Sequence, residues 1–212
     1  MADMLDYKKE YKQFYLPKTT PEIITIPSMQ FAAVRGQGDP NAENGEYAHA
    51  MELLYGISYT IKMSYKGDYA IAGYFPYVVP PLEGLWWMDG TCGFDYTKKD
   101  LFRWVSLIRL PEFVQESDFR WAAETASVKK KADFSAVELF RYDEGLCVQC
   151  MHVGPYDDEP ATIARMDAFA AQSGYALDIS TTRYHHELYL SDPRKCEPSK
   201  LKTVLRHPIR NQ

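Results

Sequence analysis

Two glutamates in short apolar and aromatic runs are the first residues of this chain that could do chemistry. Glu83 lies in the run 80–89 and Glu187 in the run 184–192, and each run includes an aspartate near its end. A carboxylate among aromatic side chains can hold a cation against their faces. It can also act as a general base on water, because burial shifts the pKa of a carboxyl group toward neutrality.

The two runs align with each other when one extra residue is allowed at Gly84 in the first run. A glycine inside a strand often marks a bulge, which holds one unpaired residue. With that bulge, Trp86 is equivalent to Tyr189, and each lies on the same face as its glutamate. We therefore expect Glu83 and Glu187 to face one shared cavity, with Glu187 as general base or ligand anchor and Glu83 as its partner. In the alternative, one of the two glutamates is a solvated strand residue.

Aromatic side chains near these glutamates are the candidate ligand contacts. Trp86 and Trp87 are adjacent, so in a strand they point to opposite faces, and the alignment favours Trp86 for the cavity. Tyr156 follows a Gly-Pro turn and either reaches the edge of the cavity or is a plain turn aromatic. Aromatic residues make up 14% of the chain. This content fits either a large aromatic core or a pocket for a flat or cationic ligand.

Hydrophobic periodicity and turn residues divide the chain into strands and helices. We expect helices at residues 6–15, 43–64, 97–103, 117–131 and 157–173, with a further short helix from Pro198. We expect strands at residues 22–35, 70–79, 104–110, 137–142, 146–152 and 202–207, and around Glu83 and Glu187. The sequence Asp143-Glu144-Gly145 predicts a hairpin turn between two of these strands.

The same order of elements occurs twice: strand, glycine turn, long helix, glutamate strand, short helix, strand. The best matched segments are 106–111 and 203–208, which read SLIRLP and TVLRHP. We predict an α+β fold in one domain that covers the whole chain. Its two modules, residues 22–116 and 135–212, are related by a pseudo-two-fold axis with a central ligand cleft, and the helix at 117–134 connects them. Chance similarity of short strands is the alternative.

Composition places the chain among ordinary globular proteins. It has 212 residues, 46% of them hydrophobic, and a net charge of −5 without a basic block. This balance argues against direct nucleic-acid binding, because such proteins usually carry a basic face. We expect no secretory signal and no membrane span, since no apolar run is long enough. We therefore expect a cytoplasmic protein whose four cysteines are reduced thiols, namely Cys92, Cys147, Cys150 and Cys196.

Three motifs that could indicate metal or cofactor binding do not fit those sites. His185 and Glu187 share one face of a strand while His186 points away, and two ligands are too few for a typical zinc site. Cys147 and Cys150 are spaced as C-x-x-C but lie in an expected strand, where this spacing puts them on opposite faces. The glycines at 36–38 lack the third glycine of a dinucleotide fingerprint. We expect neither a metal nor a cofactor.

Four blocks of the sequence resemble the stand-alone members of the GyrI-like small-molecule-binding family over almost the whole chain. They are residues 6–11, 81–87, 144–149 with 152–160, and 185–195. The resemblance implies a duplicated strand-helix-strand-strand module with a central ligand cleft. It agrees with the repeat found in the residues.

The resemblance also implies two related activities. Relatives fused to DNA-binding domains sense multiple drugs, and in them a buried glutamate and aromatic residues hold cationic, lipophilic compounds. Some stand-alone relatives hydrolyse the cyclopropane of DNA-alkylating natural products, a detoxification. The drug-binding glutamate corresponds to Glu187, and the first-module motif to Glu83, Trp86 and Trp87. His152 and Tyr156 lie in the matching second-module block, and with Tyr189 they complete the expected ligand contacts.

We therefore expect a small-molecule-binding hydrolase in which glutamate assists attack by water on an activated cyclopropane. The alternative is a non-catalytic module that sequesters its ligand or modulates a partner such as DNA gyrase. No helix-turn-helix precedes residue 22, so a transcription regulator on one chain is not expected. The sequence leaves a homodimer open and does not name the ligand.

Overall fold

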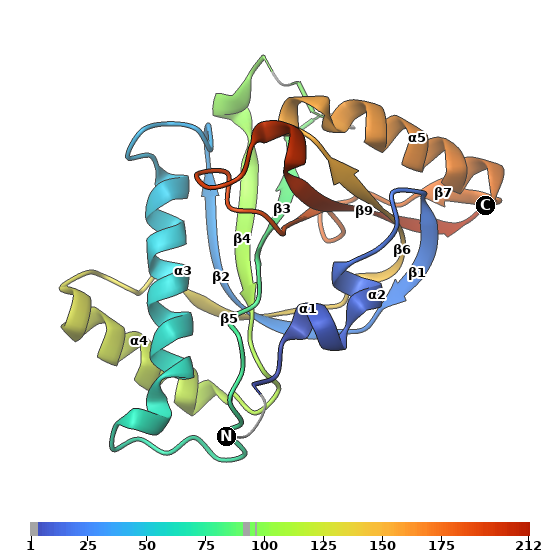
Figure 1. Cartoon of the computed structure of the whole chain (residues 1–212). Helices are drawn as coiled ribbons and strands as arrows, with labels where there is room; N and C mark the ends of the chain where they lie inside the picture. Colours follow the sequence, from blue (N-terminus) through green and yellow to red (C-terminus); the bar gives the residue numbers. More distant parts are fainter. Residues whose placement is uncertain (1–3, 91–93, 96) are drawn as a thin grey trace.

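One antiparallel sheet forms the centre of the protein. The computed structural model describes residues 4–90, 94–95 and 97–212, so Cys92 lies outside the described residues. The sheet has the strand order β1-β6-β9-β8-β3-β4-β2-β5, and the short strand β7 pairs with β9 (Figure 1). With its helices the sheet makes an α+β fold, as the sequence predicts. No helix in the described parts of the chain is long and apolar enough to cross a bilayer.

The edge strands β1 and β5 are short, and β9 is the longest strand. They are β1 (Glu22–Ile26), β2 (Met29–Gln37), β3 (Leu82–Trp87), β4 (Arg103–Arg109), β5 (Glu138–Tyr142), β6 (Gly145–Val153), β7 (Tyr175–Leu177), β8 (His185–Tyr189) and β9 (Lys202–Asn211). The helices are α1 (Tyr7–Glu10), α2 (Lys12–Tyr15), α3 (Glu46–Lys62), α4 (Glu116–Lys130) and α5 (Glu159–Gln172). Single 3-10 turns occur at η1 (Ser64–Lys66), η2 (Lys99–Leu101), η3 (Tyr156–Asp158) and η4 (Pro198–Lys200).

The three long helices lie close to the ranges that periodicity predicts, and local chemistry fixes their ends. In α4 the Asp118 carboxylate accepts a hydrogen bond from the backbone N–H of Gln115, so the N-cap is Gln115 rather than Ser117. Pro160 in the first turn of α5 has no N–H that would need a partner there. The apolar face of α3 is buried along its whole length.

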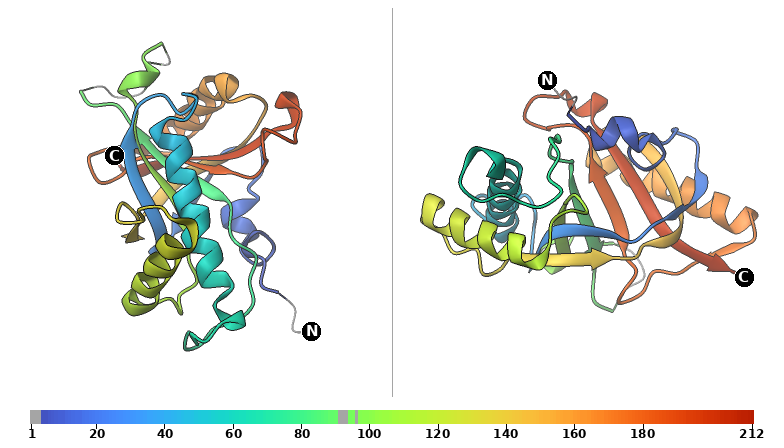
Figure 2. Two further views of the ribbon diagram at one scale, coloured as in Figure 1. Left: turned by 90° about the vertical axis from the view of Figure 1, so that its left-hand side faces the viewer. Right: turned by 90° about the horizontal axis from the view of Figure 1, so that it is seen from below.

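The two faces of the sheet carry different helices. Helices α3 and α4 pack on the face that presents Ala32, Trp86 and Ile108, and α5 packs on the same face against Cys150 and Leu205. The N-terminal helices α1 and α2 cover the opposite face, where Tyr7 and Tyr15 contact Leu188 and Val204. Figure 2 shows α3 with α4 near one end of the sheet and α5 near the other.

The order of strands supports the predicted duplication. From the central pair outward, the order is β3-β4-β2-β5 on one side and β8-β9-β6-β1 on the other. Apart from η1 in the first half and η3 and β7 in the second, the order of elements is also the same, β2-α3-β3-η2-β4 and β6-α5-β8-η4-β9. Each half gives one strand to the other, because β1 pairs with β6 and β5 pairs with β2.

Two predictions about strands are wrong. The segment 70–79 forms no strand among the described residues apart from one bridge between Tyr77 and Leu5, because its prolines and Gly73 interrupt the ladder. The predicted hairpin at 143–145 does not form either. Strands β5 and β6 follow one another but pair with different partners, so this turn carries the chain from one half of the sheet to the other.

Candidate functional site

Strands β3 and β8 form the centre of the sheet, and their register decides what each glutamate can contact. Gly84 lies opposite Glu187 and Glu83 lies opposite Leu188, in a continuous ladder without a bulge. Residues that lie directly opposite share a face of the sheet, and neighbours along a strand alternate. Glu83 and Glu187 therefore point to opposite faces. The expectation that they share one cavity is wrong.

Gly84 has a packing role instead of forming a bulge. A Cβ at this position would lie 2.4 Å from Trp86 Nε1 and 3.0 Å from the Tyr189 hydroxyl. The missing side chain lets the indole fold back over the strand, where its N–H donates a hydrogen bond of 2.9 Å to the Tyr189 oxygen. The predicted equivalence of Trp86 and Tyr189 depended on the bulge, and the expectation that Trp86 shares a face with Glu83 is wrong, because without the bulge the two point to opposite faces.

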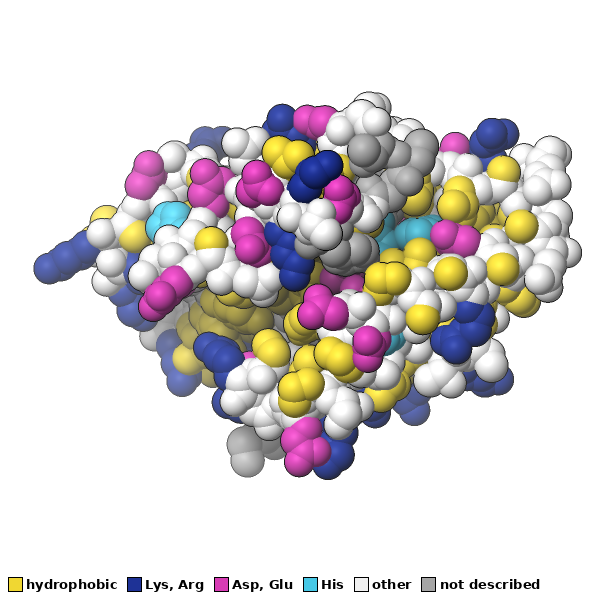
Figure 3. Space-filling view, turned by 90° about the horizontal axis from the view of Figure 1, so that it is seen from above, with side chains coloured by type: hydrophobic (Ala, Val, Ile, Leu, Met, Phe, Trp, Pro, Cys, Tyr) yellow, Lys and Arg dark blue, Asp and Glu magenta, His cyan; other side chains and the backbone are white. Residues whose placement is uncertain are grey.

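A cleft of about 2030 Å³ opens on the face that carries Glu187. Its floor includes Trp86 from β3 and Tyr189 from β8, and one wall is α3, with Tyr47. Tyr156 from η3 and the start of α5 form part of the opposite wall. Figure 3 shows a hollow in the surface with hydrophobic side chains inside it and charged side chains around it. Besides Glu159 and Glu187, the charged residues that line the cleft are Glu43, Glu52, Lys99, Lys130, Asp157, Asp192 and Arg194.

Four of the predicted contact residues line this cleft and three do not. Trp86, Tyr156, Tyr189 and Glu187 do. Trp87 lies on the opposite face, where its ring centroid is 4.8 Å from that of Tyr184. The His152 ring is buried beneath the turn, with Nδ1 2.9 Å from Thr162 Oγ1 and Nε2 3.1 Å from the carbonyl oxygen of Pro155. Glu83, the third, belongs to a buried network described below.

A second carboxylate, Glu159, faces Glu187 from the first turn of α5. Only 2% of Glu159 is exposed, and 14% of the Glu187 side chain. Burial, and then the neighbouring charge of Glu187, raise the pKa of Glu159 well above its ordinary value. This environment favours a neutral acid at Glu159. The cleft thus contains a pair of carboxyl groups with different environments, an arrangement typical of acid and base roles.

Hydroxyl groups surround the carboxyl pair and stay protonated. Burial, and then the Glu187 carboxylate, raise the pKa of Tyr189. Burial also raises the pKa of Tyr47, whose ring stacks obliquely on Trp86 at 5.4 Å between centroids. Neutral phenols can donate hydrogen bonds to a developing oxyanion. The cleft therefore combines a carboxylate, a neutral acid and phenolic donors inside an aromatic wall.

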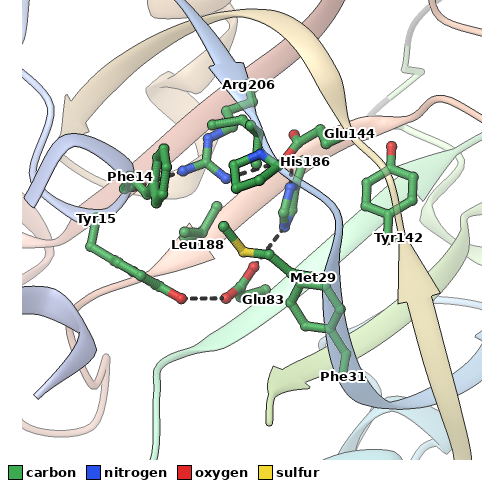
Figure 4. A pocket seen from close by; sticks show the side chains of 12 residues that line it. Phe14, Tyr15, Met29, Phe31, Glu83, Tyr142, Glu144, His186, Leu188 and Arg206 are labelled. Atoms are coloured by element: carbon green, nitrogen blue, oxygen red, sulfur yellow. Dashed lines mark hydrogen bonds and ion pairs between the residues drawn. The ribbon is translucent and has the colours of Figure 1, made fainter. Parts of the chain in front are cut away.

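Glu83 belongs to a charge network on the opposite face, in a small cavity (Figure 4). Its Oε2 lies 3.0 Å from His186 Nε2, and the other ring nitrogen, Nδ1, lies 2.9 Å from Glu144 Oε1. Arg206 donates to the second oxygen of Glu144 at 3.2 Å. The Arg206 guanidinium also donates to the oxygen of Gln149 and to the backbone carbonyl of Phe14.

The charges of this network balance. Burial alone would lower the pKa of His186, but the carboxylates of Glu144 and Glu83 raise it to about 9. Burial alone would raise the pKa of Glu144, but His186 and Arg206 lower it to about 2. Two anions thus face two cations near neutral pH. A neutralised set of this kind holds the strands together and leaves no charge for a ligand.

Among the residues that the structure describes, no cluster of three or more His, Cys, Asp or Glu side chains could hold a metal. Sequence reasoning missed Glu159, because the acids at 157–159 followed by proline are the ordinary pattern of a helix start. A usable sign was its place at the first turn of the helix that precedes the Glu187 strand. This position puts the helix end over the centre of the sheet.

The family model of the GyrI-like small molecule binding domain matches residues 19–210. This range contains both central strands, β3 and β8, and the residues on their two faces. The chain belongs to the GyrI-like family. Its cleft is accordingly the cleft of a small-molecule-binding domain. No curated protein matches the chain.

Three solved structures show what the chain is similar to. An uncharacterized conserved protein from Listeria innocua is 49% identical, with a TM-score of 0.92 over 97% of this chain and 100% of that one. A structure described as a hydrolase from the same organism is 48% identical, with a TM-score of 0.91 over 98% and 100% of the two chains. The EcmrR C-terminal domain shares the fold at 14% identity, with a TM-score of 0.56 over 91% and 98%.

Proposed function

We propose that this GyrI-like protein binds lipophilic, aromatic compounds in its cleft and hydrolyses those that carry an activated cyclopropane, such as DNA-alkylating compounds. Glu187 is the general base in this proposal. The observation that carries it is the half-enclosed Glu187 carboxylate beside the buried acid Glu159 in an aromatic cleft. Solved structures described as hydrolases at 47% and 48% identity add support.

The proposed reaction adds one water molecule to the substrate. Glu187 takes a proton from water while the water oxygen bonds to a ring carbon of the cyclopropane. The strained carbon–carbon bond breaks, and its electron pair moves into the conjugated carbonyl, whose oxygen becomes an oxyanion. The hydroxyl of Tyr189 and the neutral acid of Glu159 can donate hydrogen bonds to that oxygen. Protonation of the oxyanion completes the addition of water.

The cleft explains why the substrate should be flat and apolar. Tyr47, Trp86 and Tyr189 offer ring faces and edges, whereas the carboxylates provide negative charge that a cationic group on the ligand would offset. The cleft exceeds the usual size of a pocket for a drug-sized ligand, about 300–1,000 Å³. We therefore expect tolerance of large polycyclic compounds rather than recognition of one small metabolite.

The test is a turnover assay with an activated spirocyclopropyl dienone, followed by mass spectrometry of the product. The wild-type chain should release the ring-opened product that carries one added water. Glu187→Gln should lower kcat by about 10²–10⁴-fold, because it removes the general base. The matched control is Glu197→Gln, an exposed glutamate in the β8–β9 loop that should keep full activity. Equal rates in both variants would remove Glu187 from the mechanism.

A non-catalytic role is the second candidate, and the size of the cleft favours it. A large acidic and aromatic cleft can sequester lipophilic cations without changing them. A cationic dye would then bind with an affinity that falls in Glu187→Gln, while every cyclopropane substrate stays intact. Inhibition of DNA gyrase by the chain without loss of any ligand would instead indicate a modulator of that partner.

A further inference from the structure

A line of hydrogen-bonded side chains runs from Glu187 in the cleft to the outside of α5. His185 Nε2 lies 2.9 Å from Glu187 Oε1, and His185 Nδ1 lies 2.8 Å from His207 Nε2. The other ring nitrogen of His207, Nδ1, lies 2.6 Å from Asp167 Oδ1. The four side chains come from β8, β9 and α5, and every ring nitrogen of the two histidines has a partner within the line.

The interior of this line is dry and its outer end is open. His185 and His207 are 1% and 4% exposed, and the ring of Phe94 lies across His185 at 5.3 Å between centroids. The Asp167 side chain is 27% exposed, so its carboxylate reaches solvent. Water therefore has access to the Asp167 end but not to the two imidazoles between the carboxylates.

Counting protons shows what the line can do. Three hydrogen bonds need three protons, but two neutral imidazoles supply only two. The third proton is present when Glu187 has taken one from water or, in the equivalent form, when one imidazole is an imidazolium, and in both forms the whole line carries a net charge of one negative. Burial lowers the pKa of His207, its hydrogen bond to Asp167 opposes this, and repulsion from His185 adds to the lowering.

We propose that His185, His207 and Asp167 are positioning residues that orient the Glu187 carboxylate and carry the proton it collects to solvent. The inference rests on the proposed role of Glu187 as a base. The proton that Glu187 takes from water passes to His185 Nε2, while His185 passes its Nδ1 proton to His207 Nε2, and His207 passes its Nδ1 proton to Asp167, which releases it to solvent. No electrons change hands, Glu187 returns to the ionised state without releasing its proton into the cleft, and both rings then return to their starting tautomers.

Other titratable groups also face the cleft end of the line. They are Glu159 on α5, Tyr47 on α3, Tyr156 on η3 and Tyr189 on β8. The three tyrosines stay neutral, since burial raises the pKa of each. Burial raises the pKa of Glu159, which favours its neutral form and so reduces any charge that would draw the proton back from the histidines.

The decisive variant is Asp167→Asn, which keeps an oxygen acceptor for His207 but removes the charge. We expect kcat to fall by about tenfold, less than the loss of the base itself, with KM unchanged. Loss of the negative charge also weakens the hold of the line on its third proton. The acid limb of the kcat–pH profile, where that proton occupies Glu187, should therefore move to lower pH.

The matched control is Asp178→Asn. Asp178 is similarly exposed, at 32% of its side chain, and accepts from Arg183, but it lies outside the line. It should leave both kcat and its pH profile unchanged. Identical profiles for Asp167→Asn, Asp178→Asn and the wild-type chain would overturn the proposal, whereas a shift confined to Asp167→Asn supports it.

A second measurement keeps this inference separate from the proposed hydrolysis. Nitrogen-15 NMR of the histidine rings reports which nitrogens carry protons, and it needs no substrate. We expect the imidazole N–H protons of His185 and His207 to be protected from exchange with solvent. We also expect the titration of the His207 ring to change in Asp167→Asn. Ring N–H protons that exchange freely, with signals that do not change in Asp167→Asn, would overturn the proposed proton path even in an active enzyme. The expected signals in a chain that turns over no substrate would overturn the hydrolysis alone.

Discussion

The two faces of the β3–β8 pair carry the same kinds of charged residues but use them differently. On one face, Glu83 and Glu144 meet His186 and Arg206, and the charges cancel in a small cavity. On the other face, Glu159 and Glu187 share a large open cleft, and no arginine or lysine contacts either carboxyl group among the described residues. The two groups of charged residues lie on opposite sides of the same sheet, because neighbouring residues of β3 and of β8 point to opposite faces.

This difference shows how one pair of strands can serve both stability and chemistry. A charge that is fully paired inside the protein resists any change in protonation, as the shifted pKa values of Glu144 and His186 show. A carboxyl group that no arginine or lysine neutralises keeps its capacity to take a proton or a ligand cation. We therefore propose that the face with Glu159 and Glu187 is the functional one and that the face with the balanced charges supports it.

Removal of Glu144 should give the largest loss of stability. In Glu144→Gln, Arg206 and His186 lose a shared anion, and breaking such a buried set should lower the free energy of unfolding by about 3–5 kcal/mol. Chemical denaturation measures it. The control Glu138→Gln removes an exposed glutamate that pairs with Arg35, and it should cost less than about 1 kcal/mol. Similar losses in the two variants would contradict the contrast between the faces.

The same network should make the stability of the protein fall at both alkaline and acid pH. The pKa of His186 is raised from 6.5 to about 9, so its contribution is complete below pH 6.5 and lost as the pH rises through 9. The pKa of Glu144 is lowered from 4.5 to about 2, so its contribution is complete above pH 4.5 and lost as the pH falls through 2. Denaturation curves should give a maximum between pH 4.5 and 6.5. A maximum that stays in place in Glu144→Gln would assign it to other groups.

The smallest effect on stability, but a direct effect on the cleft, should come from Gly84→Ala. The new methyl group meets the Trp86 indole and pushes it toward the ligand space, at a cost of about 1–3 kcal/mol. Affinity for a cationic dye and the tryptophan emission should both change. Gly67→Ala is the control, since its methyl group would make only an ordinary contact, 3.7 Å from the backbone oxygen of Ser64. An unchanged dye affinity in Gly84→Ala would mean that Trp86 does not shape the site.

Much of the fold follows from the sequence because its signals are local. The apolar face of α3, the proline of α5 and the order of elements in the two halves depend on neighbouring residues. Pairing of strands does not, and the turn at Glu144 illustrates this. A glycine after two acidic residues favours a hairpin, yet β5 and β6 find better partners in β2 and β1.

The candidate site was predictable in part for the same reason. Trp86, Tyr189 and Glu187 follow from their pattern along two strands, but the pairing of Glu83 with Glu187 depended on register. A shift of one residue turns a side chain to the other face. Gly84 was consistent with a bulge in the sequence and turned out to accommodate an indole. Glu159 comes from another element, and only the folded chain brings it to Glu187.

The exchange of strands between the halves limits how the cleft can admit a ligand. Strand β1 of the first half is hydrogen-bonded to β6 of the second, and β5 of the second half is hydrogen-bonded to β2 of the first. The halves are therefore interlocked and cannot move apart without breaking these strand pairs. The distance between the walls is set when the chain folds. Large ligands must therefore enter through rearrangement of side chains and loops at the opening of the cleft, while Glu159 and Glu187 keep their positions.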